Sequence, residues 1–291
     1  MSNRFRDSVR FLDPKTGTPA RNSKYPGQPV GAEMFMADQF LAHNNNSPPP
    51  VAANGWTVTL LQAGAAATTQ GYALYPSGHQ INCDIAIGDG ANNQHLSHFN
   101  IADGQQVYFE ACYKLSGASV AATDVTKGEV FVGLSSLDTT VLASAPADYI
   151  GFVKQDVATS AGNEVRFVAG RTVVGAFSTG LDVGTGIVLD ATADGSTALG
   201  TWIRVAFLVT GTDSCEVFAG ENTWTATDKT LPTMQHIATV GTNTTGYGTG
   251  VAVLPNDLTA TSLHPTYCVR TVNTGFHFLS MPYLYAGMKL L

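Results

Sequence analysis

Charged side chains are scarce in this sequence: they make up 13% of its 291 residues, against roughly 25% in an ordinary soluble domain. The basic residues are unevenly placed, because residues 1–24 hold six of them against two acidic ones, a net charge of +4. Residues 25–291 carry nine basic and twenty acidic side chains, a net charge of −11. Nucleic acid requires a basic face that neutralises phosphates, so this acidic body argues against nucleic acid as the main partner.

Cysteine is also rare, and its spacing excludes the common metal and redox motifs. The four cysteines, at positions 83, 112, 215 and 268, form no C-x-x-C pair, so we expect them to be small core residues. No segment has the ~18 uninterrupted apolar residues of a membrane span, and the N-terminus lacks the apolar stretch of a signal peptide. We therefore expect synthesis in a host cytoplasm, no disulfides, no membrane partner and no cofactor.

Sequence motifs typical of catalytic sites are missing as well. A jelly-roll glycanase needs two carboxylates across a sugar bond, but the sequence has neither an E-x-D-x-E nor an E-x-D-x-x-E pattern. Glu110 and Glu129 each stand alone in an expected strand, which favours a solvated or paired structural acid. There is no G-x-S-x-G elbow or Walker loop, and the glycine-rich residues 246–250 predict a flexible loop. The sequence thus predicts a protein that is not an enzyme.

Two metal-site interpretations are open, and both are incomplete. His95 and His98 are three residues apart, a spacing that suits one face of a helix but falls on opposite faces of a strand, and no third ligand is fixed by spacing. Residues 89–93 are rich in oxygen ligands but match no complete calcium-loop motif. We favour plain turn residues at both places and expect no metal.

What the sequence has in quantity is turn residues between short runs of β-branched and aromatic residues. Thirty glycines and thirteen prolines supply frequent turns and leave little room for helices. Val107 and Phe109 alternate with Tyr108 and Glu110, as in a strand with one buried side. No repeat of about 20–50 residues is visible, so we expect an all-β fold, an antiparallel two-sheet β-sandwich. The expected strands are 56–61, 81–87, 106–115, 129–134, 149–154, 164–169, 171–177, 201–209, 215–219 and 276–288, with hairpins over 164–176 and 201–219.

The first fifty residues differ from the rest and are expected to form an extended N-terminal arm. Residues 1–30 show no sustained periodicity, and four prolines restrict their backbone. Residues 33–43 are compatible with a short helix that has one apolar face, and residues 44–50, NNNSPPP, favour a polyproline linker. This places a domain boundary that separates the arm, 1–50, from a sandwich domain, 51–291.

Several strand segments share a recognisable pattern. They include Tyr-Phe-Glu-Ala-x-x-Lys-Leu at 108–115, Val-Phe-Val-Gly-Leu at 130–134, Asp-Tyr-Ile-Gly-Phe at 148–152 and Trp-Ile-Arg-Val-Ala-Phe at 202–207. With these segments, residues 80–290 resemble the concanavalin A-like, laminin-G-like jelly-roll proteins of tailed bacteriophage particles. The resemblance implies a jelly roll, a role as a capsid decoration (cement) protein or other minor virion component, and no catalytic residues. Cys112 departs from the family, which often has Arg there.

A decoration role would give the arm a physical task. An arm that orders on docking buries a long strip of surface across several shell subunits, and apolar anchors that alternate with arginines suit such docking. The expected partners are the major capsid protein and neighbouring copies of this chain on the exterior of a virion; a merely disordered, solvated tail is the alternative. The candidate capsid-binding residues are Arg4, Phe5, Arg6, Val9, Arg10, Phe11 and Leu12.

Two other functions stay open. A carbohydrate-binding module for host attachment would hold sugars on exposed aromatic rings, for which Trp56, Trp224 and Tyr247 are the candidate stacking residues. A glycan-cleaving enzyme would need the paired acids that the sequence does not show.

Overall fold

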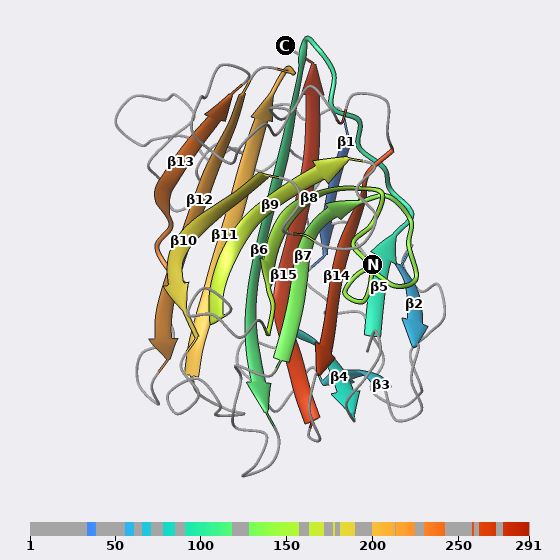
Figure 1. Cartoon of the computed structure of the whole chain (residues 1–291), viewed down its shortest axis with the longest axis vertical. Helices are drawn as coiled ribbons and strands as arrows, with labels where there is room; N and C mark the ends of the chain where they lie inside the picture. The colour runs from blue at the N-terminus through green and yellow to red at the C-terminus, as the bar shows by residue number, and fades with distance from the viewer. Residues whose placement is uncertain are drawn as a thin grey trace, which may run out of the picture.

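The computed structural model of the chain describes fifteen strands and the segments next to them (Figure 1). Within this described part no helix is long and apolar enough to cross a membrane. The described residues are 34–38, 56–60, 66–70, 78–84, 91–117, 128–156, 163–171, 177, 181–189, 200–212, 214–224, 230–241, 258, 262–271 and 276–290.

The strands form two antiparallel sheets packed face to face, which confirms the expected β-sandwich. In Figure 1 the seven-stranded front sheet overlies the eight-stranded back sheet. The order in the front sheet is β10 (Leu181–Val188), β9 (Glu164–Arg171), β8 (Asp148–Lys154), β7 (Gly128–Ser135), β14 (His264–Thr271), β5 (Ala91–His95) and β2 (Trp56–Leu60). The order in the back sheet is β13 (Gln235–Gly241), β12 (Ser214–Trp224), β11 (Gly200–Thr210), β6 (Gln105–Gly117), β15 (Phe276–Leu290), β4 (Gly78–Asp84) and β3 (Ala66–Gln70), with β1 (Met34–Asp38) also paired to β15.

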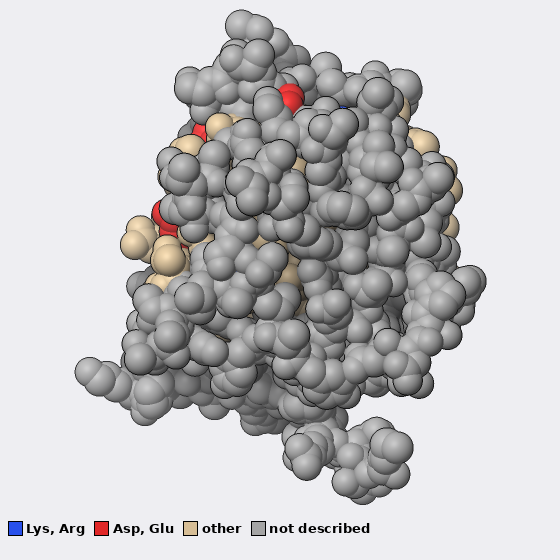
Figure 2. Space-filling model, turned by 90° about the horizontal axis from the view of Figure 1, so that it is seen from below, with Lys and Arg blue, Asp and Glu red and all other residues tan. Residues whose placement is uncertain are grey.

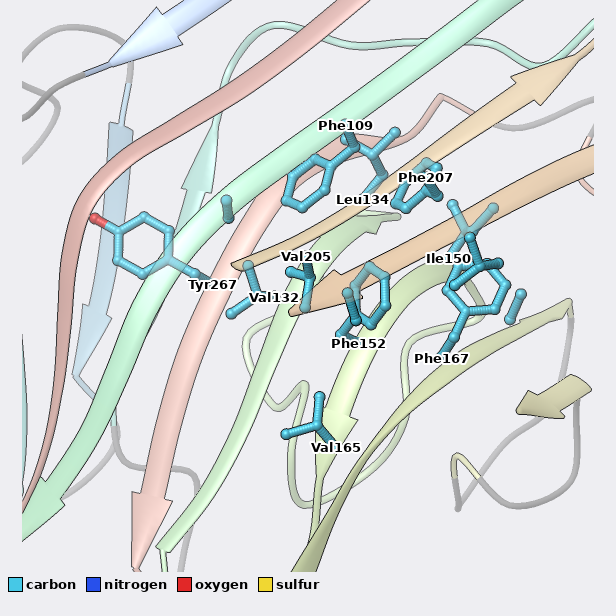
Figure 3. Close-up of a cluster of buried hydrophobic side chains, with 14 of the residues drawn as sticks. Phe109, Val132, Leu134, Ile150, Phe152, Val165, Phe167, Val205, Phe207 and Tyr267 are labelled. Carbon is cyan, nitrogen blue, oxygen red and sulfur yellow. The ribbon is translucent and has the colours of Figure 1, made fainter. Parts of the chain in front are cut away.

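The core lies between the sheets, and aromatic side chains from both sheets meet in it (Figure 3). Phe109 and Phe207 of the back sheet stack with their ring centroids 5.2 Å apart. Phe207 also lies 5.9 Å from Phe167 of the front sheet, which packs edge-on against Phe152 at 5.3 Å. Burial of each such ring contributes roughly 1.5–3 kcal/mol, so this cluster holds the two layers together.

Strand β6 confirms the expected alternation but not the single buried side. Val107 and Phe109 face the core, whereas Tyr108 and Glu110 face away from it and are nevertheless only 1% exposed. The cause is a second apolar layer on the outer face of the back sheet, where Met234 packs against the cluster that contains Tyr108. Both faces of this sheet are therefore buried at its centre.

The short helix expected over 33–43 is wrong, because Met34–Asp38 is strand β1. Met34 pairs with Met288 and Asp38 with Leu284, so β1 adds to an edge of β15. A helix of this length has marginal stability in water. As a strand, the same segment forms backbone hydrogen bonds with β15 through every second residue. The rest of the arm, and the boundary near residue 50, lie outside the described residues.

The two expected hairpins have different outcomes. The hairpin over 201–219 is confirmed: β11 and β12 pair around a turn in which Gly211 has a φ of 58°. The hairpin over 164–176 is wrong, since β9 continues through Gly170 and pairs with both β8 and β10. A Cβ on Gly170 would lie 2.6 Å from the Tyr149 hydroxyl oxygen, so this glycine marks close packing rather than a turn.

Candidate functional site

A buried carboxylate, that of Glu110, lies on the outer face of the back sheet and is a candidate catalytic acid. Oε1 of Glu110 lies 2.8 Å from Nε and 2.6 Å from Nη2 of Arg204 and accepts a hydrogen bond of 2.8 Å from the Tyr283 hydroxyl. The Tyr108 hydroxyl donates to Oε2. Arg204 is fully buried and also donates to the carbonyl oxygen of Pro232. The carboxylate is thus neutralised by a guanidinium and saturated by hydroxyl donors.

The local electrostatics raise the pKa values of two tyrosines and the arginine in this cluster. Burial raises the pKa of the Tyr108 and Tyr283 hydroxyls well above their ordinary value, and the nearby charge of Glu110 raises it further. Burial alone would lower the pKa of Arg204, but its attraction to Glu110 outweighs this effect and the pKa is raised. The tyrosines therefore stay protonated as donors and the arginine stays charged.

On the front sheet three acids, Glu129, Glu164 and Asp182, are also paired. Glu129 binds Arg270 through Oε2, with Nε of Arg270 at 2.5 Å, and its Oε1 accepts the backbone N–H of Asp156 at 3.1 Å. Glu129 therefore has the structural role expected of a strand-face acid. On β9 and β10, Arg166 lies 2.6 Å from Glu164 and 2.5 Å from Asp182. None of these described acids has a second acid as its bonded partner.

The middle of the front sheet's outer face is covered rather than open. Phe131 stacks on Phe177 at 5.2 Å, and Tyr149 meets Phe177 edge-on at 4.9 Å. Val141 and Leu142, from the segment between β7 and β8, belong to the same buried cluster. A sugar chain therefore has no access to the sheet surface beneath these side chains.

Gln94, in strand β5, forms hydrogen bonds with the segment between β7 and β8 that covers this face. Its Nε2 atom donates to the carbonyl oxygen of Ser136 at 3.0 Å, and its Oε1 atom accepts the N–H of Asp138 at 2.9 Å. Asn92 donates to the carbonyl oxygen of Thr139. The polar residues that suggested a calcium loop thus lie in a strand in which Asn92, Asn93 and Gln94 are buried. Residues 88–90 lie outside the described part of the chain.

The histidines of the zinc interpretation do not converge on one point. Nδ1 of His95 accepts the backbone N–H of Ser97 at 3.0 Å, so this nitrogen is committed to a hydrogen bond. The His95 carbonyl oxygen is 3.0 Å from Nδ1 of His264, whose ring centroid is 6.1 Å from that of His98. Among the residues that the structure describes, no group of three His, Cys, Asp or Glu side chains is placed to hold a metal ion.

Most of the predicted binding residues lie outside the described part of the molecule. The backbone of Trp56 begins β2 at one edge of the front sheet, and that of Trp224 ends β12 at the other side of the back sheet (Figure 1). The structure therefore does not bring these two positions together. Their side chains, Tyr247 and arm residues 4–12 lie outside the described part of the molecule. On the face shown in Figure 2, the acidic residues that the structure describes appear as a few separate red spots.

Sequence reasoning missed the pairing of Glu110 with Arg204, although a signal for it exists. Each charged residue interrupts an apolar run, Tyr-Phe-Glu-Ala in β6 and Trp-Ile-Arg-Val in β11. In antiparallel register Arg204 lies opposite Cys112, one position along the same face from Glu110. Trp202 shares this face, with Nζ of Lys114 5.8 Å from its ring centroid. Two opposite charges in adjacent apolar strands are the pattern that predicts a buried pair.

The buried hydroxyls and thiols lead to a pH prediction: the free energy of unfolding should fall as the pH rises from about 9 to about 12. Burial, and to a smaller extent Asp182, raises the pKa of Tyr149 from 10.0 to about 12, and burial raises those of Tyr108, Tyr283 and Cys112. The unfolded chain therefore loses protons first, so the stabilisation is complete below the unfolded pKa values and is lost above them. For Tyr149 the rise corresponds to roughly 3 kcal/mol. Urea unfolding midpoints measured across this pH range, together with tyrosinate absorbance, test this prediction. Titration of the buried tyrosines near pH 10 without loss of structure would contradict it.

Comparison with known proteins identifies the fold but no family. No protein-family model matches the chain, and no curated protein matches it. The chain is similar to the lectin UEA-II complexed with galactose, with a TM-score of 0.50 and 10% identity over 89% of this chain and 100% of that chain. It is also similar to a beta-1,3-glucanase from Mycobacterium marinum, with a TM-score of 0.46 and 11% identity over 89% and 100% of the two chains. The likeness to the lectin supports a concanavalin A-like β-sandwich, the fold that the resemblance implied; neither of these names describes a virion protein.

Proposed function

We propose that this protein is a non-catalytic structural protein of a virion, of the capsid decoration type, whose N-terminal arm anchors it to the shell. The observation that supports a non-catalytic role is the bonding of three glutamates in the two sheets. Glu110, Glu129 and Glu164 are each paired with an arginine, and both oxygens of each are engaged. A glycosidase needs one carboxylic acid and one carboxylate facing a sugar, and these side chains supply neither.

The arrangement of the arm supports the anchoring role. The arm continues directly into β1, whose five residues pair with β15 at the interior of the back sheet. A force applied to residues 1–33 would act on the backbone hydrogen bonds between β1 and β15, which are distributed along the strand and not concentrated at one point. The +4 charge of residues 1–24 against the −11 of the remainder also favours contact of the arm, rather than the body, with an acidic shell surface.

Removal of residues 1–33 is expected to abolish binding to capsid shells while the sandwich stays folded. The deletion keeps β1 and so leaves the back sheet complete. Two aromatic anchors, Phe5 and Phe11, at about 2 kcal/mol each correspond to roughly 1000-fold in affinity. Cosedimentation with shells assembled from the major capsid protein of the same virus measures binding, and circular dichroism confirms the fold.

A matched pair of variants separates the contributions of apolar anchors and charge. Phe5→Ser/Phe11→Ser keeps the arginines, whereas Arg4→Gln/Arg10→Gln keeps the aromatic rings. We expect the first variant to lose most of the affinity and the second to lose a smaller part that shrinks further at high salt. Full binding by the chain without residues 1–33 would overturn the anchoring role.

A carbohydrate-binding module is the second candidate function, and the likeness to a lectin whose structure holds galactose favours it. Trp56 and Trp224 would then act as separate stacking surfaces, because their backbones lie in different sheets. Glycan binding that is lost on Trp56→Ala or Trp224→Ala would favour this function over shell decoration. Glycan hydrolysis by the purified chain would overturn the non-catalytic proposal as a whole.

A further inference from the structure

Strand β15 is flanked in an unusual way. On one side β6 pairs with it over nearly its whole length, from His277 to Leu290. On the other side β4 pairs only with Phe276–Met281, and β1 pairs with Leu284–Met288. Two short strands, end to end, thus share one edge of β15. If β1 left, five residues of β15 would have an open edge beside the core residues Leu284 and Ala286.

Strand β1 is joined to the sandwich mainly through this one edge. Among the described strands it pairs with β15 alone. Its connection to β2 in the opposite sheet is residues 39–55, seventeen residues that include Asn44-Asn45-Asn46-Ser47 and three prolines. A proline-rich segment of this length spans up to roughly 50 Å when extended. A linker of that length permits β1 to pair with a β15 edge other than its own when the two copies lie within this span.

We propose that β1 is an exchangeable strand: in a concentrated assembly, β1 of one copy pairs with β15 of a second copy. The partner is another copy of this chain, and the inference does not depend on attachment to a shell. The pairing site on β15 is defined by its register with β1, in which Met34 lies opposite Met288, Met36 opposite Ala286 and Asp38 opposite Leu284. Because the chain is the same, a donated β1 makes every contact that the copy's own β1 makes.

The balance between the two states is set by concentration. The contacts are equal in both, so exchange gains or loses little in hydrogen bonding or burial. A strand that a linker joins to its own pairing site has an effective concentration of about 1 mM there, and copies in a concentrated assembly reach similar values. Exchange would then link neighbouring copies through backbone pairing in addition to any contact between their surfaces.

Mixed single-cysteine variants test the exchange. Met34→Cys protein is mixed with Met288→Cys protein that carries a tag of different mass, and the mixture is unfolded, refolded at about 1 mM and oxidised. Directly opposed strand residues are within disulfide range, so exchanged molecules form a disulfide-linked mixed dimer. Asp38→Cys mixed with Met288→Cys is the matched control, because Asp38 lies opposite Leu284, roughly 13 Å along the strand.

The expected result is at least about fivefold more mixed dimer than in the control mixture, with a decline as the refolding concentration is lowered to about 1 μM. The double variant Met34→Cys/Met288→Cys shows that the pair forms a disulfide: at about 1 μM it should close within one chain. Closure of this double variant, together with no excess of mixed dimer over the control at about 1 mM, would overturn the proposal. Shell binding is not measured in this experiment, so its result is distinguishable from a failure of the proposed decoration role.

Discussion

Replacing Arg204 with methionine is expected to lower the free energy of unfolding by about 3–5 kcal/mol. The substitution keeps much of the side-chain volume but leaves Glu110 buried without its cation, with only the hydroxyls of Tyr108 and Tyr283 as partners. The loss should appear as a lower urea midpoint at pH 7, followed by far-ultraviolet circular dichroism. A change below about 1 kcal/mol would mean that water reaches the carboxylate.

Two further variants identify the cause of this loss. Arg166→Met removes an arginine that also bonds two acids, Glu164 and Asp182, but its side chain is 26% exposed. Partly exposed ion pairs contribute little, so we expect a loss of about 1 kcal/mol or less. Adding Glu110→Gln to Arg204→Met should restore part of the stability, since the uncompensated charge is gone while an acceptor for the two tyrosines remains.

Substitution of Gly151 by alanine is expected to destabilise the front sheet by about 3 kcal/mol. Gly151 on β8 lies directly opposite Gly133 on β7. A Cβ on Gly151 would lie 2.6 Å from the Val132 carbonyl oxygen and 2.7 Å from Cα of Gly133. Because these neighbours are backbone atoms, the two strands would have to separate to accept the methyl group. Thermal unfolding measures the loss.

Gly186→Ala is the matched control for this prediction. Gly186 has a φ of 79°, but nothing lies within 4 Å of its Cβ position. The control therefore carries a backbone cost of about 1–2 kcal/mol and no steric clash. Equal losses at Gly151 and Gly186 would show that the close approach of β7 and β8 does not determine the stability of this region.

The fold class could be predicted from the sequence because its signals are local. Alternation of apolar residues in β6 and turn residues at Gly211 are visible within a few positions and agree with the structure. Strand β5, Ala-Asn-Asn-Gln-His, could not be predicted this way, since its residues favour turns. Its amides are buried because Gln94 bonds a segment about forty residues away, and such a partner is not visible locally.

The same limit explains why the candidate site was only partly predicted. The sequence indicated that Glu110 and Glu129 are structural acids, but not which arginines pair with them. Arg204 follows Glu110 by 94 positions and Arg270 follows Glu129 by 141. These pairs are set by the strand order, which depends on how the two sheets assemble. The strand conformation of β1 could not be predicted for the same reason, because it depends on an edge of β15, about 250 residues away.

The strand order also has a consequence for how the protein is made. Strands β14 and β15, the last two described strands in sequence order, lie inside their sheets: β14 between β7 and β5, and β15 between β6 and the pair β4 and β1. Until the ribosome has added both strands, each sheet exists as two separate halves with exposed apolar edges. Neither sheet can therefore be completed until β14 and β15 have been synthesised, and folding by such distant pairings is slow. During that interval the nascent chain would depend on chaperones to avoid aggregation.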